Sequence, residues 1–357
     1  MCFFKIKSEK GGMKAFVVVL VLLIIIAGAL LAIKVFKGNE EETVADNHTN
    51  LNTLQNNVEE QPKTLSGNSR PIAVMIDNNI NAMPQAGLLE ADIVYEIIVE
   101  GGETRLMLIL QDKDIDKIGP IRSSRHYFLD YALENDAIYV HYGWSPQAES
   151  DITKYSVNNI NGITESEDSF WRTNERYAPH NVLTSTEDIM SIAKRKGYRT
   201  TTSQDTVLNY VVGEVELEDG EVANTVTIPY TSSNVVEYEY LPEEKMYVRY
   251  SRGEKQVDWT TGEDIKTKNI IIEKVENSTL NDGSNKGRQT IDNIKEVDGY
   301  YITNGKVIPI TCIKTSRTEQ TVYRNLAGEE IDVNDGKTFI QICPENANVT
   351  FEEWGVR

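Results

Sequence analysis

Residues 72–79 read IAVMIDNN, five apolar residues of strand length closed by an acidic residue and two asparagines. Two more strand-like runs follow, Ile93–Val99 and Arg105–Leu110, which are joined through Gly101 and Gly102. Closely spaced runs of this length indicate a β-sheet. We therefore expect the folded body to begin near Arg70 with strands of one sheet.

Helical segments alternate with strands in the region that follows. Tyr127–Leu133 carries apolar residues at helical spacing. Ser145-Pro146 predicts the start of a second helix, because serine caps helices and proline suits the first helical position. Thr184–Lys196 is the clearest helix, with a serine cap and a glycine directly after it. Residues 70–205 are therefore predicted to form a mixed α/β domain.

The pattern changes to short strands beyond residue 205. Val235–Tyr240 and Met246–Tyr250 flank a turn, and Asn304-Gly305 is a strong hairpin signal. Asp335-Gly336 introduces a last predicted strand, and no long helical pattern occurs here. Residues 222–345 are therefore predicted to form a mainly antiparallel β domain with its own core, which makes the fold class α+β.

The N-terminal region contains a membrane-anchor pattern. Ala15–Ile33 holds nineteen residues without a charge, which as a helix span about 28 Å, close to the thickness of a bilayer. A cleaved signal peptide is the alternative, because Ala27-Gly28-Ala29 resembles a cleavage site. The apolar run continues past that site, beyond the usual length of a signal-peptide core. We therefore predict an uncleaved transmembrane helix over residues 15–36.

Lysines around this segment predict its orientation. Lys5, Lys7, Lys10 and Lys14 precede it, whereas Lys34 and Lys37 follow it. Positive charge favours the cytoplasmic side, so residues 1–14 are predicted to be cytoplasmic and the body extracytoplasmic, in a single-pass protein of the cell membrane. Residues 37–69 are polar and without periodicity, and are predicted to be a disordered linker.

Charge and cysteine content exclude several classes of function. The net charge of the 357 residues is −19, and the excess lies after residue 69, where 29 basic residues face 48 acidic ones. Such a body would repel nucleic acid. Three cysteines exclude a disulfide-dense scaffold and a multi-cysteine zinc module. Cys312 and Cys343 lie in predicted strands, where a disulfide and two buried thiols are both open.

Seven separated motifs occur in order along the folded body. They are Met75-Ile76-Asp77-Asn78, Pro84-Gln85-x-Gly87-Leu88, Ala91-Asp92-Ile93-Val94-Tyr95-Glu96, Glu100-Gly101-Gly102-x-Thr104-Arg105, Ile118-Gly119-Pro120-Ile121-Arg122-Ser123-x-Arg125, Tyr139-Val140-His141 with Ser145-Pro146-Gln147-Ala148, and Ala178-Pro179-His180-Asn181. Together they resemble the YerB-like lipoprotein family of bacteria, a domain of unknown function with a separate C-terminal domain. The resemblance covers about residues 70–345 and implies a location and a layout, but no activity. The chain departs from the family in lacking the lipid-acceptor cysteine.

An arginine group is the main candidate for a ligand site. Arg105, Arg122 and Arg125 lie close to Ser123 and Ser124, which we expect to cap a helix that begins at about Arg125. Guanidinium groups beside a helix start can bind an anion. The alternative is that these arginines form structural ion pairs with Glu96, Glu100 and Glu103.

Other polar residues of the motifs are candidates for the same pocket. They are Asp77, Asn78, Glu96, His141, Gln147, His180 and Asn181. The histidine spacing matches no zinc motif, so no metal site is predicted, and no cofactor is identified. Satisfied structural histidines and turn-forming Asp77 are the alternatives.

Three functions are compatible with this pattern. The first is a membrane-anchored, extracytoplasmic binding or accessory protein of the cell envelope with an anion site. The second is an enzyme acting on a phosphate-bearing envelope lipid or glycan, since the order of strands and Arg-Ser segment is similar to that of LytR-CpsA-Psr ligases. The third is a structural module that docks a partner protein through its β domain.

Overall fold

The computed structural model describes residues 61–353. The predicted cytoplasmic segment 1–14 and anchor 15–36 lie outside these residues, as does most of the predicted linker. Within the described residues, no helix combines the length and apolar character needed to cross a membrane. The described residues all belong to one compact unit.

The end of the predicted linker is folded. Leu65 is buried in the core, and the backbone N–H groups of Lys63 and Thr64 donate to the carboxylate of Asp335, each at 2.9 Å. Gly67 is bonded to the side chain of Gln111 in both directions. The prediction of disorder is therefore wrong for residues 61–69. Leu65 packs into the core, and the polar backbone groups of the segment are bonded to the body.

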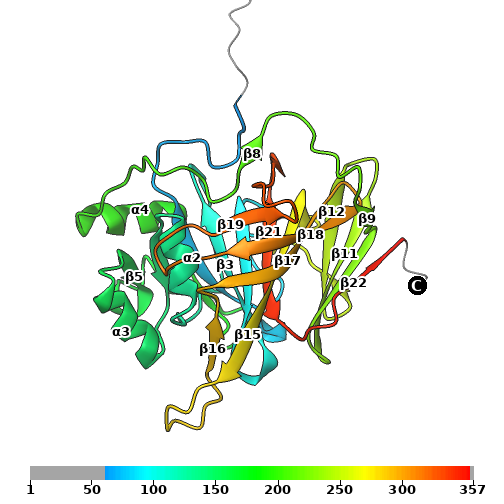
Figure 1. Cartoon of the computed structure of the whole chain (residues 1–357). Coiled ribbons are helices and arrows are strands. Elements are labelled where there is room, and N and C mark those ends of the chain that lie inside the picture. The colour runs from blue at the N-terminus through cyan, green and yellow to red at the C-terminus, as the bar shows by residue number, and fades with distance from the viewer. Residues whose placement is uncertain (1–60, 354–357) are drawn as a thin grey trace, which may run out of the picture. The chain divides into compact units, whose positions relative to one another are not determined.

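A twelve-stranded mixed sheet is the centre of the molecule (Figure 1). Its main path runs in the order β19 (Val322–Asn325), β18 (Lys306–Ile313), β17 (Glu296–Thr303), β15 (Asn269–Thr279), β21 (Thr338–Pro344), β2 (Ile93–Ile98), β3 (Thr104–Leu110), β1 (Ile72–Asp77), β4 (Ile138–His141) and β5 (Asn159–Asn161). Two further strands attach to it, β16 (Gln289–Asp292) beside β15 and β9 (Glu221–Val222) beside β18.

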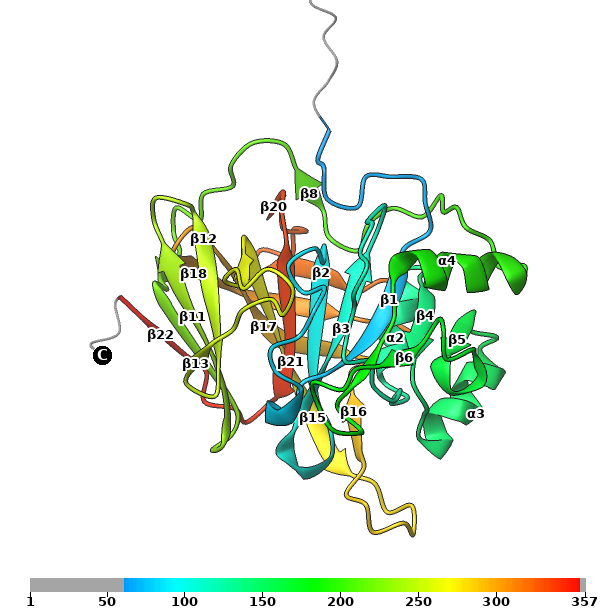
Figure 2. The same cartoon turned by 180° about the vertical axis from the view of Figure 1, so that it is seen from behind.

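A six-stranded antiparallel sheet and the helices cover the central sheet (Figures 1 and 2). This second sheet contains β13 (Glu254–Lys255), β12 (Met246–Ser251), β11 (Asn234–Leu241), β10 (Thr225–Thr231), β22 (Thr350–Glu352) and β14 (Lys266–Thr267). The helices are α2 (Phe128–Glu134), α3 (Pro146–Lys154) and α4 (Thr186–Arg195), with short 3-10 turns η1 (Ile80–Ala82), η2 (Glu100–Gly102) and η3 (Gly162–Thr164). Two small ladders pair β6 (Trp171–Arg172) with β7 (Val182–Leu183) and β8 (Tyr210–Val211) with β20 (Val333–Asn334).

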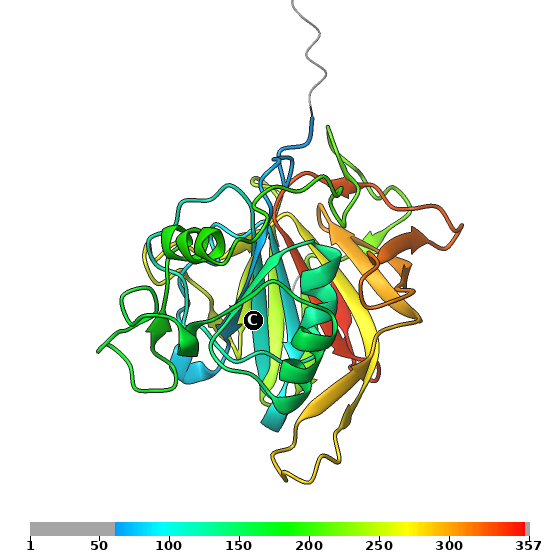
Figure 3. The same cartoon turned by 90° about the vertical axis from the view of Figure 1, so that its left-hand side faces the viewer.

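Alternating residues of the central strands belong to two different hydrophobic cores. On one face Val74, Val94 and Leu108 pack with α4 and the six-stranded sheet. On the other face Met75 and Tyr95 pack against α2, which lies in front of the strands in Figure 3. Strands covered on both faces are mostly apolar, and this holds for β1, β2 and β21, whose residues are all buried, including the polar Asp77, Glu96 and Gln341.

The predicted division into two separate cores is wrong. Strands β15 and β21 of the C-terminal half lie in the central sheet, where β21 pairs in parallel with β2 of the N-terminal half. The mixed α/β character of the first half and the mainly antiparallel β character of the second are as predicted. The reason for the error is that strand pattern indicates β-structure without identifying the partner strand, which here is far away in sequence.

Local sequence signals are confirmed. Ser145 caps α3 by accepting from Ala148 N, with Pro146 at the first helical position, and Ser185 caps α4 by accepting from Asp188 N. Asn304-Gly305 forms the tight turn between β17 and β18 with both residues at positive φ. The strand predicted to be last, β21, is followed by β22.

Candidate functional site

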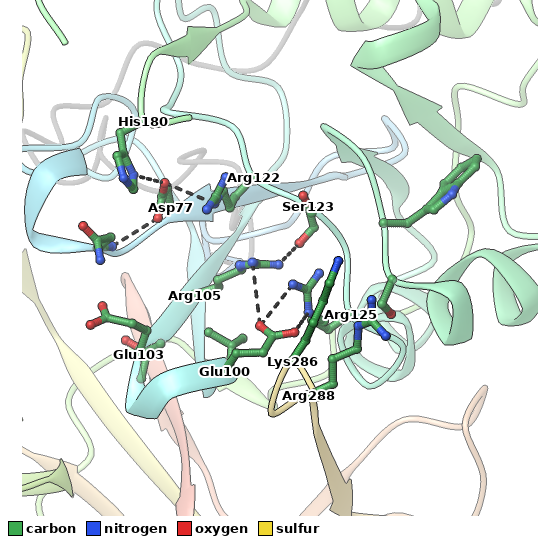
Figure 4. Close-up of a pocket in the computed structure, with 15 residues that line it drawn as sticks. Asp77, Glu100, Glu103, Arg105, Arg122, Ser123, Arg125, His180, Lys286 and Arg288 are labelled. Carbon is green, nitrogen blue, oxygen red and sulfur yellow. Dashed lines mark hydrogen bonds and ion pairs between the residues drawn. The ribbon is translucent and has the colours of Figure 1, made fainter. Parts of the chain in front are cut away.

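A polar cleft of about 490 Å³ opens beside the end of β1 (Figure 4). This volume suits a small-molecule site. Its wall combines the end of β1, the η2 turn, the start of β3, the segment 122–125, His180 and the loop between β15 and β16. The cleft therefore draws on both halves of the chain.

Strand register places the first two charged side chains. Asp77 ends β1 and lies opposite Arg105 of antiparallel β3, and both are more than nine-tenths buried. The next segment runs along β1, because Asp77 N donates to Pro120 O at 2.8 Å and Arg122 N donates to Met75 O at 2.9 Å. These bonds hold Arg122 beside Asp77.

Asp77 is the acceptor for two side chains. Its Oδ2 atom lies 2.7 Å from Nδ1 of His180 and 3.2 Å from Nε of Arg122. Its Oδ1 atom accepts the backbone N–H of Asn79 at 3.2 Å. The buried carboxylate thereby fixes one imidazole and one guanidinium at the wall of the cleft (Figure 4).

Glu100 of η2 joins the other two arginines. Arg125 Nε and Nη2 donate to its two oxygens at 2.6 and 3.0 Å, and Arg105 Nη2 lies 3.9 Å away. Burial by itself raises the pKa of Glu100, but the bonds from Arg125 and the two positive charges outweigh it and lower the pKa below its ordinary value. Glu100 therefore remains a carboxylate.

Arg105 is the most enclosed cation of the cleft. Burial, and then the positive charge of Arg125, lower its pKa to about 9. Its Nη1 atom donates to the carbonyl of Ser123. A guanidinium this deeply desolvated gains more from an added negative charge than one in water.

The β15–β16 loop adds Lys286 and Arg288, which sequence reasoning missed. Arg288 Nη1 lies 2.5 Å from Oδ2 of Asp282, which Gln147 Nε2 also contacts at 3.1 Å. The available signal was a pair of basic residues flanking Gly287 within an acidic chain. The lining also contains Asn79, Val99, Thr104, Trp144 and Ser145. Glu103 lines the cleft too and is paired with Arg252 at 2.7 Å.

The cleft is positive although the chain is acidic. Its lining and their direct ion-pair partners comprise six cations and four carboxylates. The cations are Arg105, Arg122, Arg125, Arg252, Lys286 and Arg288, and the carboxylates are Asp77, Glu100, Glu103 and Asp282. The balance is two positive charges, in a chain whose net charge is −19. An anionic ligand is therefore favoured over a cationic one.

Six of the predicted residues meet in this cleft, namely Asp77, Arg105, Arg122, Ser123, Arg125 and His180. The ion-pair alternative is supported for Arg125 and Arg105, which face Glu100 and also line the cleft. Ion-paired guanidinium groups and a polar cleft thus lie in one place.

Ser124 is not a helix cap. It is fully buried and accepts a hydrogen bond from Tyr139 OH at 2.8 Å. Helix α2 begins at Phe128 and receives no side-chain cap, so the expectation of a capped helix at Arg125 is wrong. Backbone bonds from Ser124 N to Gly143 O and from Ser145 N to Ser124 O hold this segment extended instead.

Glu96 and Asn78 belong to the interior. Glu96 is fully buried and forms an ion pair with the equally buried Arg249 of β12 at 2.5 Å. Asn78 donates to Glu96 at 3.0 Å and to Thr104 at 2.8 Å. These bonds join the central sheet to the six-stranded sheet, and neither residue lines the cleft. Strand ends alone did not reveal which polar group faces inward.

His141, Gln147 and Asn181 also lie outside the lining. His141 is buried between Gly143 O and Asn159 Oδ1, at 2.8 and 3.1 Å, and burial lowers its pKa to about 4. Asn181 holds the loop of His180, because its Nδ2 atom donates to Thr173 O at 3.0 Å. Each therefore supports the site's scaffold.

Among the described residues, no group of three His, Cys, Asp or Glu side chains is arranged to hold a metal ion. Cys312 and Cys343 are free and buried. They belong to different hydrophobic cores. Burial raises the pKa of the Cys343 thiol to about 12.

Comparison with known proteins confirms the family resemblance. Residues 57–199 match the family model described as "Protein of unknown function (DUF3048) N-terminal domain", and residues 226–340 match the corresponding C-terminal domain. The chain is 32% identical over 290 residues to "Putative lipoprotein YerB" of Bacillus subtilis (strain 168), covering 77% of this chain and 82% of that protein.

A solved structure has the same fold. The crystal structure of the YerB protein from Bacillus subtilis matches with a TM-score of 0.71 and 31% identity, over 79% of this chain and 94% of that chain. The two family segments lie near the predicted ranges 70–205 and 222–345, although their strands share one sheet.

Proposed function

This chain belongs to the DUF3048 protein family, and on that basis we propose that it is a membrane-anchored, extracytoplasmic accessory protein of the cell envelope whose cleft binds a phosphate-bearing ligand. Two observations support the location. The relative in Bacillus subtilis bears the name "Putative lipoprotein YerB", and the apolar segment Ala15–Ile33 has the length of a membrane span.

One observation carries the ligand class, namely the convergence of Arg105, Arg122 and Lys286 on one cleft. They come from β3, from the segment beside β1 and from the β15–β16 loop, so their donors approach from three directions. A planar carboxylate is satisfied by one guanidinium fork, whereas phosphate offers several oxygens to several donors.

Free donor capacity remains in the cleft. Arg122 uses Nε for Asp77, and within the described part of the chain no protein acceptor contacts its two terminal nitrogens or the ammonium of Lys286. Arg122 is also about a quarter exposed. These groups are therefore the ones available to an incoming anion.

The proposal is tested by thermal unfolding of the full chain with phosphate or pyrophosphate at constant ionic strength. A ligand that binds the folded form raises the Tm, because it stabilises that form. At a ligand concentration of a hundred times the Kd, the free energy of unfolding increases by about 2.7 kcal/mol. Chloride is the comparison at the same ionic strength.

A substitution makes this test specific. Arg122→Lys should reduce the rise in Tm with little change without ligand, since lysine keeps the charge and loses the fork. Arg195→Lys, on α4 and outside the cleft, is the matched control. An equal Tm with every anion would contradict the proposed function.

The structure supplies less support for a protein-docking module. The large apolar side chains exposed among the described residues are Ile80, Ile163, Tyr177, Val212, Val222 and Leu326. They come from separate segments, and none belongs to the six-stranded sheet.

A further inference from the structure

The cleft contains a histidine oriented by a carboxylate. Asp77 Oδ2 fixes Nδ1 of His180 at 2.7 Å, which leaves Nε2 as the ring nitrogen for a ligand in the cleft (Figure 4). The imidazole is 18% exposed, whereas Asp77 is almost fully buried. A partly exposed imidazole held by a buried carboxylate is the arrangement that a general base requires.

The other described histidines are arranged differently. Both ring nitrogens of His141 are occupied, by Gly143 O and by Asn159. His126 contacts Thr290 through Nε2 at 3.2 Å and is absent from the cleft lining. Of the histidines in residues 61–353, His180 is the one that forms an ion pair with a carboxylate.

We infer that this protein hydrolyses a phosphate ester in the cleft, with His180 as the general base and Asp77 as the residue that positions it. The inference rests on the proposed anion site and adds a reaction to it. Arg105, Arg122 and Lys286 would bind the phosphoryl group, where fixed positive charge stabilises the charge that develops in the transition state.

Water is the nucleophile in this reaction. Ser123 lines the cleft next to Arg122 in sequence, but its Oγ donates to Tyr142 O at 3.0 Å and is held back by that bond. Ser145 Oγ is engaged as the cap of α3. Neither serine has a contact with His180 that would activate it.

Hydrolysis is a displacement by water at phosphorus. A lone pair of the water oxygen forms the new bond to phosphorus while the water proton moves to His180 Nε2. The bond from phosphorus to the alcohol oxygen breaks, its electron pair stays on that oxygen, and the oxygen takes a proton from solvent. His180 then releases its proton to solvent, so that one ester and one water give one alcohol and one phosphate.

Asp77 supports the charged intermediate state of the ring. Its carboxylate faces Nδ1 and stabilises the imidazolium that forms when Nε2 takes a proton. The other charged groups near this pair are Arg122, bonded to Asp77, and Arg176 on the same loop as His180, whose charge also acts on Asp77.

The test uses the full chain with p-nitrophenyl phosphate and bis(p-nitrophenyl) phosphate as probes. Wild-type protein should release p-nitrophenol from at least one of them, and His180→Asn should lower that rate about 100-fold. Asparagine can still donate to Asp77 but offers no basic nitrogen, so the phosphate-induced rise in Tm should remain. His126→Gln, which keeps an amide donor near Thr290, should leave the rate unchanged.

Asp77→Asn tests the positioning role through the pH profile. Removing the negative charge makes the imidazolium less stable, so the rising limb of the rate should move to lower pH and the maximum rate should fall. A profile that keeps its position would overturn the role of Asp77. Equal losses in His180→Asn and His126→Gln would assign the effect to folding and overturn the role of His180.

The two proposals fail in different ways. A rise in Tm with phosphate but no hydrolysis of either probe overturns this inference and leaves the binding function in place. No rise in Tm with any anion overturns the binding function, and the hydrolysis inference with it.

Discussion

Asp77 and Arg105 lie directly opposite each other on antiparallel β1 and β3, yet each is bonded elsewhere. Asp77 bonds to Arg122 and His180, while Arg105 reaches Ser123 and lies 3.9 Å from Glu100. The two residues of this cross-strand pair therefore belong to two polar clusters, one around Asp77 and one around Glu100. Each carboxylate is shared, Asp77 between Arg122 and His180 and Glu100 between Arg125 and Arg105, which leaves positive charge for an added anion.

Lys286 should contribute to anion binding from the C-terminal half. Lys286→Gln is expected to reduce the phosphate-induced rise in Tm and to leave the Tm without ligand nearly unchanged, because its ammonium has no protein acceptor in the described part of the chain. Thermal scans with and without phosphate measure both quantities. Lys255→Gln, on the six-stranded sheet, is the control, and an equal effect of the two substitutions would remove Lys286 from the site.

Glu96 should be essential for stability. Glu96→Gln leaves the guanidinium of Arg249 fully buried without its counter-charge, which costs about 3–5 kcal/mol. The double variant Glu96→Leu with Arg249→Met should recover part of this loss, since it buries no charge. Urea unfolding followed by circular dichroism gives both values.

The same experiment tests whether the two halves unfold together. Because β2 and β21 are neighbours in one sheet, a single transition is expected in wild type and in both variants. Two resolved transitions would contradict the single compact unit.

Glu273 should make stability fall as pH rises. Burial, and then the charge of Glu134, raise its pKa to about 7, while Tyr131 and Tyr323 donate to its two oxygens at 3.0 and 2.8 Å. The folded protein therefore keeps a proton that the unfolded chain releases at lower pH, and stability is lost between about pH 4.5 and 7. The slope is about 1.4 kcal/mol for each pH unit at most.

Glu273→Gln isolates this contribution, since the amide is neutral at every pH. The variant should lose less stability than wild type between pH 5 and 7. Asp130 contributes in the same direction, and buried His126 and His141, whose pKa values burial lowers to about 4, contribute in the opposite one. The difference between wild type and variant removes these shared terms. The exposed substitution Glu254→Gln should show the wild-type slope.

The anchor prediction is tested by a reporter. An enzyme active only outside the cytoplasm, fused after residue 60, should be active, because more lysines precede Ala15–Ile33 than follow it. Activity of a cytoplasmic reporter at the same position would reverse the orientation.

Local elements were predictable because their signals are local. The caps of α3 and α4 and the Asn304-Gly305 turn each depend on a few adjacent residues. The pairing of β21 with β2 was not predictable, since every strand offers the same backbone groups. The sequence of β21, TFIQICP, is mostly apolar on both faces, which is typical of a strand covered on both faces.

The candidate site was likewise predictable only where its signals are local in sequence. The motifs around Arg105, Arg122 and His180 identified the wall contributed by the N-terminal half. Glu96 was wrongly assigned to the pocket. A polar residue in a predicted strand does not show whether it faces a cleft or a buried cation, which here is Arg249. Lys286 was missed because it lies in the loop between the paired strands β15 and β16. The place of this loop beside the cleft follows from sheet order and not from neighbouring residues.

The place of β2 in the sheet also governs how the protein is made. During synthesis β2 is complete when residue 98 has been added, but its neighbour β21 is complete only at residue 344. Until then one side of β2 presents unpaired backbone groups, which are a template for adhesion between nascent chains. Residues up to 344 must therefore be synthesised before this side of β2 can pair. A chaperone that shields this edge would raise the yield of native protein.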